Sequence, residues 1–252
     1  MTRPVTLITG ASAGLGTEFA RYCARRGEAL VLVARRRDRL EALKAELGGE
    51  VHVVAADLSE AGAAASLMAQ VAAEGLTVDT LINNAGFGGG GRFAEQSLER
   101  QREMIDLNVA ALTELCHLVL GPMRERRKGA ILNVASTAAF QPGPGSAVYF
   151  ATKAYVLSFT EALHQELKGT GIKVSALCPG PTATEFGLAA GYSGPQLKRF
   201  KASASGVVEA GMEGLDRNRA IVIPGFANKA GAQASRFLPR AAVRRLIASL
   251  RF

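Results

Sequence analysis

The sequence predicts one α/β domain over residues 1–252, built on a mostly parallel β-sheet. Two observations support this fold class. Short apolar runs rich in β-branched residues recur along the chain, and segments with helical periodicity separate them, as is typical of alternating βα units. No composition break or internal repeat divides the 252 residues, which are an ordinary length for one such domain.

The chain begins with a predicted strand, a glycine-rich turn and a helix. Residues 5–9 are apolar and β-branched, residues 9–16 read Thr-Gly-Ala-Ser-Ala-Gly-Leu-Gly, and helical periodicity then continues to about Gly27. Glycines let a backbone approach a pyrophosphate closely, and a helix N-terminus offers free N–H groups and a positive dipole end. This order is typical of a dinucleotide-binding unit, although an ordinary βα turn has the same elements.

The second predicted strand, residues 29–34, ends in a run of arginines. In a dinucleotide-binding unit this strand end meets the cofactor's ribose, where an aspartate would bind the 2′-hydroxyl. Arg35 and Arg36 stand there instead, and guanidinium groups form charge-assisted, often bidentate bonds with phosphate. We therefore predict NADP(H) rather than NAD(H). The alternative is that these arginines only cap the strand and begin a basic helix, as we expect for Arg39.

The third and fourth predicted strands, residues 51–55 and 78–82, each end in polar side chains. Asp57 follows the third strand, where its carboxylate would accept from an adenine amine or cap the next helix. Asn-Asn-Ala-Gly at 83–86 follows the fourth and can place amides against a ligand at the carboxyl edge of the sheet. The glycine-rich residues 86–91 are predicted to form a loop over the site or a plain connector.

A long helix is predicted over residues 98–120, with Asn108 in its middle. Asparagine is unfavourable inside a helix because its side chain competes for backbone groups, so we predict that Asn108 holds a water or bends the helix. Further strands are predicted at residues 130–134, 172–177 and 220–224, and a turn containing two prolines follows the second of these.

Tyr149 and Lys153 are four residues apart, which places them about one turn apart on one face of a helix. A free phenol has a pKa of about 10, and a nearby ammonium favours the phenolate, which suits an acid/base catalyst. The pattern is common by itself, and a surface tyrosine and lysine would produce it too. Its place after a predicted dinucleotide-binding unit favours the catalytic interpretation.

Charge and cysteine content limit the classes of function. The formal net charge of +8 comes partly from the arginines at 35–39 and partly from a basic segment at 236–252. Such a charge suits a phosphorylated cofactor, nucleic acid or an anionic membrane.

Three dispersed cysteines have no metal-ligand spacing and suit a reducing compartment, so we predict a cytoplasmic protein without a metal site. We expect no signal peptide and no membrane-spanning helix, because no apolar run approaches the required length.

Taken together, these motifs resemble the short-chain dehydrogenase/reductase family from Thr9 to about Thr184. The shared features are Thr-Gly-x-x-x-Gly-x-Gly at 9–16, Asn-Asn-Ala-Gly at 83–86, the helix asparagine, a serine thirteen residues before the tyrosine, Tyr-x-x-x-Lys at 149–153 and Pro-Gly at 179–180. The resemblance implies a Rossmann-type, doubly wound sheet of seven strands with helices on both faces. It also implies hydride transfer between nicotinamide and a carbonyl or alcohol carbon, in a homodimer or homotetramer joined through helices around Asn108 and Tyr149.

The resemblance assigns roles to matching positions. Tyr149 would donate a proton to the carbonyl oxygen, and Ser136 would hold that oxygen by a hydrogen bond. Lys153 would lower the pKa of the tyrosine and bond the nicotinamide ribose, and Asn108 would hold a water linking Lys153 to solvent. The implied cofactor contacts are Gly10, Ser12, Gly14, Leu15 and Gly16 near the pyrophosphate and adenosine, Asp57 and Leu58 at the adenine, Asn84, Ala85 and Gly86 along the ribose, and Pro179, Gly180, Thr182 and Thr184 near the nicotinamide.

Position 13 and residues 185–208 depart from the family pattern. Position 13 is alanine where some NADP-preferring relatives carry lysine or arginine, so the cofactor prediction depends on Arg35 and Arg36. Residues 185–208 correspond to the family's variable substrate lid, and their composition predicts an apolar pocket with a basic rim, or alternatively a solvated loop. Residues 238–252 are predicted to form an amphipathic helix that packs on the domain or on a second subunit, with membrane contact as the less favoured alternative.

We therefore predict an NADPH-dependent ketoreductase that acts on a hydrophobic ketone or a 3-oxoacyl- or steroid-like substrate. A non-catalytic NADP(H)-sensing protein on the same fold is the alternative, because fold alone does not specify activity. The presence of both Tyr149 and Lys153 disfavours that alternative. Nucleic-acid binding has only the net charge in its favour, and we do not expect it.

Overall fold

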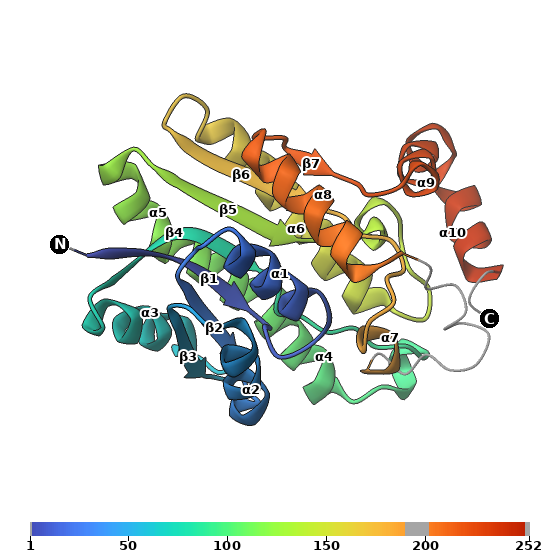
Figure 1. Cartoon of the computed structure of the whole chain (residues 1–252). Helices are drawn as coiled ribbons and strands as arrows, with labels where there is room; N and C mark the ends of the chain where they lie inside the picture. The colour runs from blue at the N-terminus through green and yellow to red at the C-terminus, as the bar shows by residue number, and fades with distance from the viewer. Residues whose placement is uncertain (1, 190–201, 250–252) are drawn as a thin grey trace.

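The structure is a computed structural model that describes residues 2–189 and 202–249. Seven parallel strands form one sheet in the order β3-β2-β1-β4-β5-β6-β7, with helices on both faces (Figure 1). The strands are β1 Arg3–Thr9, β2 Leu30–Ala34, β3 Val51–Ala55, β4 Leu76–Asn83, β5 Gly129–Val134, β6 Ile172–Leu177 and β7 Ile221–Val222. This arrangement confirms the predicted doubly wound α/β fold.

Each face of the sheet supports its own hydrophobic cluster, because neighbouring residues of a strand point to opposite faces. On β1, Leu7 belongs to one cluster and Ile8 to the other. The Ile8 side is covered by α1 Gly14–Arg25, α2 Arg37–Leu47 and α8 Ala204–Asp216. The Leu7 side is covered by α3 Ala63–Ala73, α5 Leu112–Arg126 and α6 Ala147–Glu166.

The strand order reverses between β1 and β4. From β1 the chain proceeds outward through β2 and β3, and it then returns to β4 and continues outward on the other side. In open parallel sheets, ligands bind beside the carboxyl ends of the strands at such a reversal. Predicted site residues follow the carboxyl ends of all six strands from β1 to β6, so the topology gathers them there.

One continuous helix, Leu98–Arg126, is long and apolar enough to cross a membrane by length and composition, which the sequence analysis did not anticipate. It consists of α4 Leu98–Ile105, a π-helical segment η2 Asp106–Ala111, and α5. Its residues Leu115 and Cys116 are completely or almost completely buried in the cluster on the Leu7 side. The helix is therefore a core helix of this domain, and its apolar character reflects packing against the sheet.

The remaining elements lie around the carboxyl edge of the sheet. They are η1 Phe93–Glu95, η3 Thr137–Phe140, α7 Phe186–Ala189, α9 Phe226–Phe237 and α10 Arg240–Ser249. The sequence analysis predicted a helix at the position of α10 but not α9. Of the predicted lid, residues 190–201, with the predicted basic rim, lie outside the described residues.

Candidate active site

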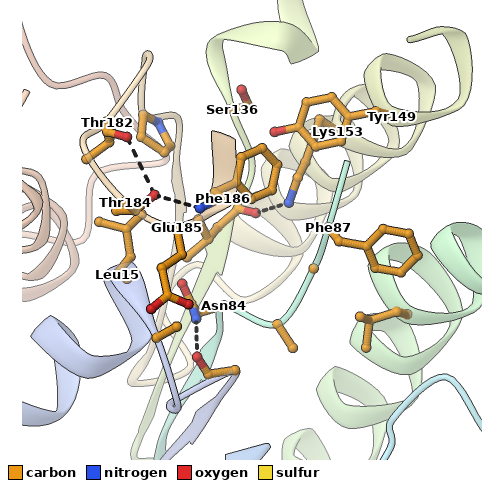
Figure 2. A pocket seen from close by; sticks show the side chains of 18 of the residues that line it. Leu15, Asn84, Phe87, Ser136, Tyr149, Lys153, Thr182, Thr184, Glu185 and Phe186 are labelled. Carbon is orange, nitrogen blue, oxygen red and sulfur yellow. Dashed lines mark hydrogen bonds between the residues drawn. The ribbon is translucent and has the colours of Figure 1, made fainter. Parts of the chain in front are cut away.

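A cavity of about 700 Å³ lies at the carboxyl edge of the sheet. Every predicted site residue lines it except Gly16 and Asn108, which lie behind its wall. Residues after β1 and β2 form one end, and the catalytic candidates form the other. Figure 2 shows Ser136, Tyr149 and Lys153 grouped at the second end, with Leu15 and Asn84 toward the first.

The glycine-rich turn is shaped to receive a phosphate group. Gly10 and Gly14 have φ values of +65° and +57°, which glycine adopts without strain. A Cβ atom at Gly16 would lie 2.1 Å from the carbonyl oxygen of Gly10, so only glycine permits this close turn. The N-cap residue Ala13 provides no side-chain cap, which leaves the first N–H groups of α1 available to a pyrophosphate. These residues fit a dinucleotide.

Thr9 and Asn84 join the ends of β1 and β4. The Thr9 Oγ1 atom accepts from the backbone N–H groups of Asn84 at 3.0 Å and Ala85 at 2.9 Å. The Asn84 Nδ2 atom donates to the carbonyl oxygens of Thr9 at 2.9 Å and Gly10 at 3.2 Å. Asn84 therefore holds the two strand ends in register at the floor of the cavity.

The arginines after β2 are held by carboxylates. Arg35 Nη1 lies 3.4 Å from Asp57 Oδ2 and 3.3 Å from Glu103 Oε1. Arg36 lies 3.7 Å from a carboxylate oxygen of Glu185. Arg39, expected only to begin α2, instead lies 3.0 Å from both Glu185 carboxylate oxygens. Because these side chains are exposed, each ion pair is worth only ~0–1 kcal/mol, and a phosphate can replace it.

Asp57 stabilises a turn rather than a helix N-terminus. Its Oδ1 atom accepts from the backbone N–H of Ser59 at 3.0 Å and from the Ser59 hydroxyl at 2.6 Å. The alternative that Asp57 caps the next helix is wrong, because α3 begins at Ala63 after the N-cap residue Gly62. Burial opposes ionisation, but the hydrogen bonds from Ser59 and the charge of Arg35 outweigh it and hold the pKa of the Asp57 carboxyl below its usual value.

The catalytic candidates are close together. Ser136 follows β5, and its Oγ atom accepts from the backbone N–H of Ala138 at 3.0 Å, which leaves its hydroxyl proton to donate elsewhere. Lys153 is buried on α6, and its Nζ atom donates to the carbonyl oxygen of Val134 at 2.8 Å. That Nζ atom lies 6.0 Å from the centre of the Tyr149 ring. Burial lowers the pKa of the Lys153 ammonium to about 8.

Asn108 is 1% exposed within the π-helical segment η2, a kind of irregularity often found at functional sites. Its Oδ1 atom accepts from the backbone N–H of Phe87 at 3.1 Å. Its Nδ2 atom donates to the Phe87 carbonyl at 3.0 Å and to Thr152 Oγ1 at 3.1 Å. Both side-chain N–H groups are thus used, and they fix the glycine-rich loop to α6. The predicted water relay through this residue stays a prediction.

The glycine-rich loop passes directly over the site, as one of the two sequence interpretations expected. A Cβ atom at Gly86 would lie 2.9 Å from Asn108 Oδ1 and 3.5 Å from Lys153 Nζ. A Cβ atom at Gly88 would lie 3.1 Å from the Phe186 ring and 3.2 Å from the Tyr149 ring. The missing side chains therefore allow the loop to contact the catalytic candidates.

Sequence reasoning missed some cavity residues. Ile247 of α10 lines the cavity, and so do Gln141 and Arg100, whose guanidinium carbon lies 3.7 Å from the centre of the Phe87 ring. The Phe186 ring centre lies 5.6 Å from that of Tyr149. The apolar residues Val243 and Ile247, four positions apart, indicated that one face of α10 packs on the domain or on a second subunit. Nothing in the sequence indicated that this face borders the cavity.

Comparisons with known proteins agree with this geometry. A family model described as short chain dehydrogenase matches residues 4–190. The chain is 39% identical over 184 residues to the NADP-dependent 3-hydroxy acid dehydrogenase YdfG of Salmonella typhi, covering 72% of this chain and 74% of that protein. A short-chain dehydrogenase from Sphingobium yanoikuyae, solved in complex with NADPH, superposes with a TM-score of 0.83 and 36% identity over 93% of this chain and 94% of that one.

A structure of a 7β-hydroxysteroid dehydrogenase, studied for its stereoselectivity, superposes with a TM-score of 0.88 at 29% identity, covering 98% of this chain and 96% of that one. The family model covers most of β1, strands β2 to β6, the glycine-rich turn and the catalytic candidates. Both structural matches extend over more than nine-tenths of each chain. The chain belongs to the short-chain dehydrogenase/reductase family and is an NADP(H)-dependent oxidoreductase acting on CH–OH and C=O groups.

Proposed function

We propose that this protein is an NADPH-dependent ketoreductase for hydrophobic ketones, with Tyr149 as its proton donor. The observation that carries the proposal is the grouping of Tyr149 with Ser136 and the buried amine of Lys153 at one end of the cavity (Figure 2). These groups lie beneath the glycine-rich loop, at the end of the cavity away from Arg35 and Arg36.

NADPH, when bound, supplies the hydride. The Ser136 hydroxyl donates a hydrogen bond to the ketone oxygen and orients it, since its bond with Ala138 uses an acceptor lone pair and not its proton. Tyr149 transfers its phenolic proton to that oxygen as the carbonyl carbon is reduced, which yields the alcohol and a phenolate. Lys153 stabilises this phenolate by its charge, and its N–H groups not used by Val134 are available to hydroxyls of the ribose. A proton from solvent restores the phenol.

Asn108 acts in this account as a positioning residue. It holds the backbone of Phe87 and the side chain of Thr152, and Thr152 Oγ1 in turn lies 2.8 Å from the carbonyl oxygen of Tyr149. The loop and the catalytic helix α6 are thereby kept in one arrangement. Such fixed geometry favours catalysis because the reacting groups need no reorganisation.

The side chains near Tyr149 support a hydrophobic substrate. Phe186 and Phe150 line the cavity beside the Tyr149 ring, and Ile247 of α10 also lines the cavity. Together these side chains offer apolar contacts to a ketone. The relatives differ in substrate size, since one is named for 3-hydroxy acids and another for a hydroxysteroid. The apolar lining favours a 3-oxoacyl- or steroid-like ketone over a small polar acid.

We also propose that residues 1–252 form one catalytic domain that acts in the cytoplasm as a homodimer or homotetramer. The outer surface of α5 and α6 supports an interface there. Tyr155 is 40% exposed, stacks on Phe159 at 5.6 Å between ring centres, and hydrogen-bonds Thr113 at 2.9 Å. Sedimentation equilibrium of the full chain tests this proposal, and a monomer at micromolar concentration would contradict it.

The function is tested by NADPH oxidation with a panel of ketones: small aryl ketones, 3-oxoacyl esters, steroid ketones and sugars. We expect turnover with one hydrophobic class, and Tyr149→Phe should lose turnover while still binding NADPH. A non-catalytic NADP(H)-sensing protein would bind NADPH tightly and reduce none of the ketones in the panel. Turnover retained in Tyr149→Phe would contradict the proposed role of the tyrosine.

A further inference from the structure

Helices α9 and α10 stand beyond the carboxyl edge of the sheet (Figure 1) and differ in charge from the rest of the chain. Residues 217–252 contain eight of the 30 lysines and arginines and none of the 22 aspartates and glutamates. They therefore carry the entire formal net charge of +8, and the first 216 residues are neutral overall. The charge is a property of this segment and not of the domain as a whole.

The same segment exposes large apolar side chains. Phe226 is 88% exposed and Phe237 is 84% exposed, and because they are eleven residues apart on α9 they lie within about 20° of each other around its axis. Leu238 and Leu246 are also exposed. We call this set the C-terminal surface: Phe226, Lys229, Phe237, Leu238, Arg240, Arg244, Arg245 and Leu246.

The cations of the C-terminal surface have no carboxylate partners within the part of the chain that the structure describes. Lys229, Arg240, Arg244 and Arg245 are all exposed and none takes part in an ion pair there. Elsewhere the exposed arginines are commonly paired, as Arg26 is with Asp216 at 2.8 Å. The C-terminal surface is therefore both apolar and cationic, without internal neutralisation.

We propose that the C-terminal surface docks on an anionic lipid membrane. Aromatic and aliphatic side chains beside lysines and arginines are the combination that binds the boundary between headgroups and acyl chains. A second copy of this chain is a poorer occupant, because a symmetric contact would bring two such cationic surfaces together with no carboxylate between them. A nucleic acid would satisfy the cations but leave the two exposed phenylalanines without an apolar contact.

The docking surface adjoins the cavity. On α10, Ile247 lines the cavity while its neighbour Leu246 is exposed, so one helix borders the substrate site and the docking surface together. A docked enzyme would hold its cavity near the lipid, which suits a hydrophobic ketone drawn from the membrane. Only this consequence rests on the proposed function; the docking itself is independent of turnover.

The test is cosedimentation of the full chain with vesicles of phosphatidylcholine alone and with vesicles of phosphatidylcholine and phosphatidylglycerol in equal parts. We expect binding to the anionic vesicles at least about ten-fold stronger, and weakened by salt. Arg240→Gln/Arg244→Gln/Arg245→Gln should abolish most of it, whereas the charge-matched control Arg92→Gln/Arg124→Gln/Lys168→Gln, at exposed positions elsewhere, should retain it. NADPH turnover with a small water-soluble ketone confirms that each variant is folded.

A second pair of variants separates membrane docking from simple attraction of polyanions. Phe226→Ser/Phe237→Ser should weaken vesicle binding several-fold, whereas Phe93→Ser, at a position 59% exposed on η1, should leave it unchanged. Equal binding to both vesicle types, or full binding by the Phe226→Ser/Phe237→Ser variant, would overturn the proposal. A change of this variant to a smaller oligomer would also overturn it, because a second copy would then be the occupant.

Discussion

The two ends of the cavity are built in different ways. At the end near β2, Arg36 and Arg39 share the carboxylate of Glu185, and the side chains of these residues are between 43% and 58% exposed. At the catalytic end, Lys153 and Asn108 are 6% and 1% exposed and are held by backbone and side-chain hydrogen bonds. Exposed ion pairs exchange readily for a ligand, whereas buried hydrogen bonds preserve one geometry. The first end is therefore suited to selecting the cofactor, and the second to chemistry.

A short segment connects these ends. Glu185 contacts the arginines, and the next residue, Phe186, contacts the ring of Tyr149 (Figure 2). A phosphate that displaces the Glu185 carboxylate would therefore act on a segment that also borders Tyr149.

The largest effect is expected from Lys153→Met, which removes the buried charge at the catalytic end and keeps an unbranched side chain. We expect kcat to fall by at least about 10²-fold, because the phenolate of Tyr149 loses its stabilising cation. NADPH binding, measured by fluorescence titration, should weaken far less, because the arginines at the other end are unchanged. A kcat within a few-fold of wild type would contradict the role given to Lys153.

The same variant tests the pKa of Lys153. Burial lowers that pKa from 10.5 to about 8, so the folded protein holds this proton less tightly than the unfolded chain. Between about pH 8 and pH 10.5 the stability of the wild type should therefore rise with pH relative to Lys153→Met, by up to about 3 kcal/mol. Urea unfolding across this range measures the difference. A pH-independent difference would show that the amine is not desolvated.

At the other end, Arg35→Ala/Arg36→Ala should lower the preference for NADPH over NADH by about 10- to 100-fold, because a hydrogen bond to a charged group contributes about 1.5–3 kcal/mol. The ratio of kcat/KM for the two cofactors is the measurement. Arg37→Ala is the matched control, since that arginine is 63% exposed and pairs with Glu41 within its own helix. An unchanged ratio in the double variant would contradict phosphate binding by Arg35 and Arg36.

Gly86→Ala tests the close approach of the loop to the catalytic groups. The added Cβ atom would meet Asn108 Oδ1 at 2.9 Å, so the buried network must shift. We expect about a ten-fold loss of kcat and destabilisation by about 1–3 kcal/mol. Gly121→Ala on α5 is the control, because nothing lies within 4 Å of its added Cβ atom, and helix propensity predicts slight stabilisation. Equal effects at both glycines would remove the steric explanation.

The smallest effect is expected from Glu185→Gln. The carboxylate would compete with the 2′-phosphate for Arg36, so its neutralisation should tighten NADPH binding by about two- to five-fold, the worth of an exposed ion pair. NADH binding should not change. Glu41→Gln, which breaks the pair with Arg37, is the control. Weaker NADPH binding in Glu185→Gln would show that the carboxylate supports the site rather than competes for it.

Sequence patterns with a local cause predicted most of the fold and the site. The apolar runs located the strands. Residues of the glycine-rich turn, Tyr149 and Lys153 line one cavity, and their local geometry could be predicted because it depends on near neighbours in the chain. Partners that come together only in the folded protein were missed. Arg39 pairs with Glu185, Ile247 reaches the cavity from α10, and Asn108 holds the backbone of Phe87.

The choice between the two interpretations of Asp57, a helix cap or a ligand contact, also depended on the folded structure. Its sequence context, a polar run before an alanine-rich helix, is equally compatible with a cap and with a ligand contact. Only the observed start of α3 at Ala63 excludes the helix cap. Likewise, the length and composition of the helix through Asn108 meet the requirement of a membrane span, and its packing against the sheet explains that composition instead.

The most direct test of the division between the two ends is the rate of hydride transfer in a single turnover at saturating NADPH. It is followed by the loss of NADPH absorbance in the wild type, in Tyr149→Phe and in Arg35→Ala/Arg36→Ala, with a ketone found in the substrate panel. We predict that Tyr149→Phe slows transfer by at least about 10²-fold and that the arginine variant stays within about two-fold of the wild type. A comparable slowing in both variants, or in neither, would contradict the assignment of chemistry to one end and cofactor selection to the other.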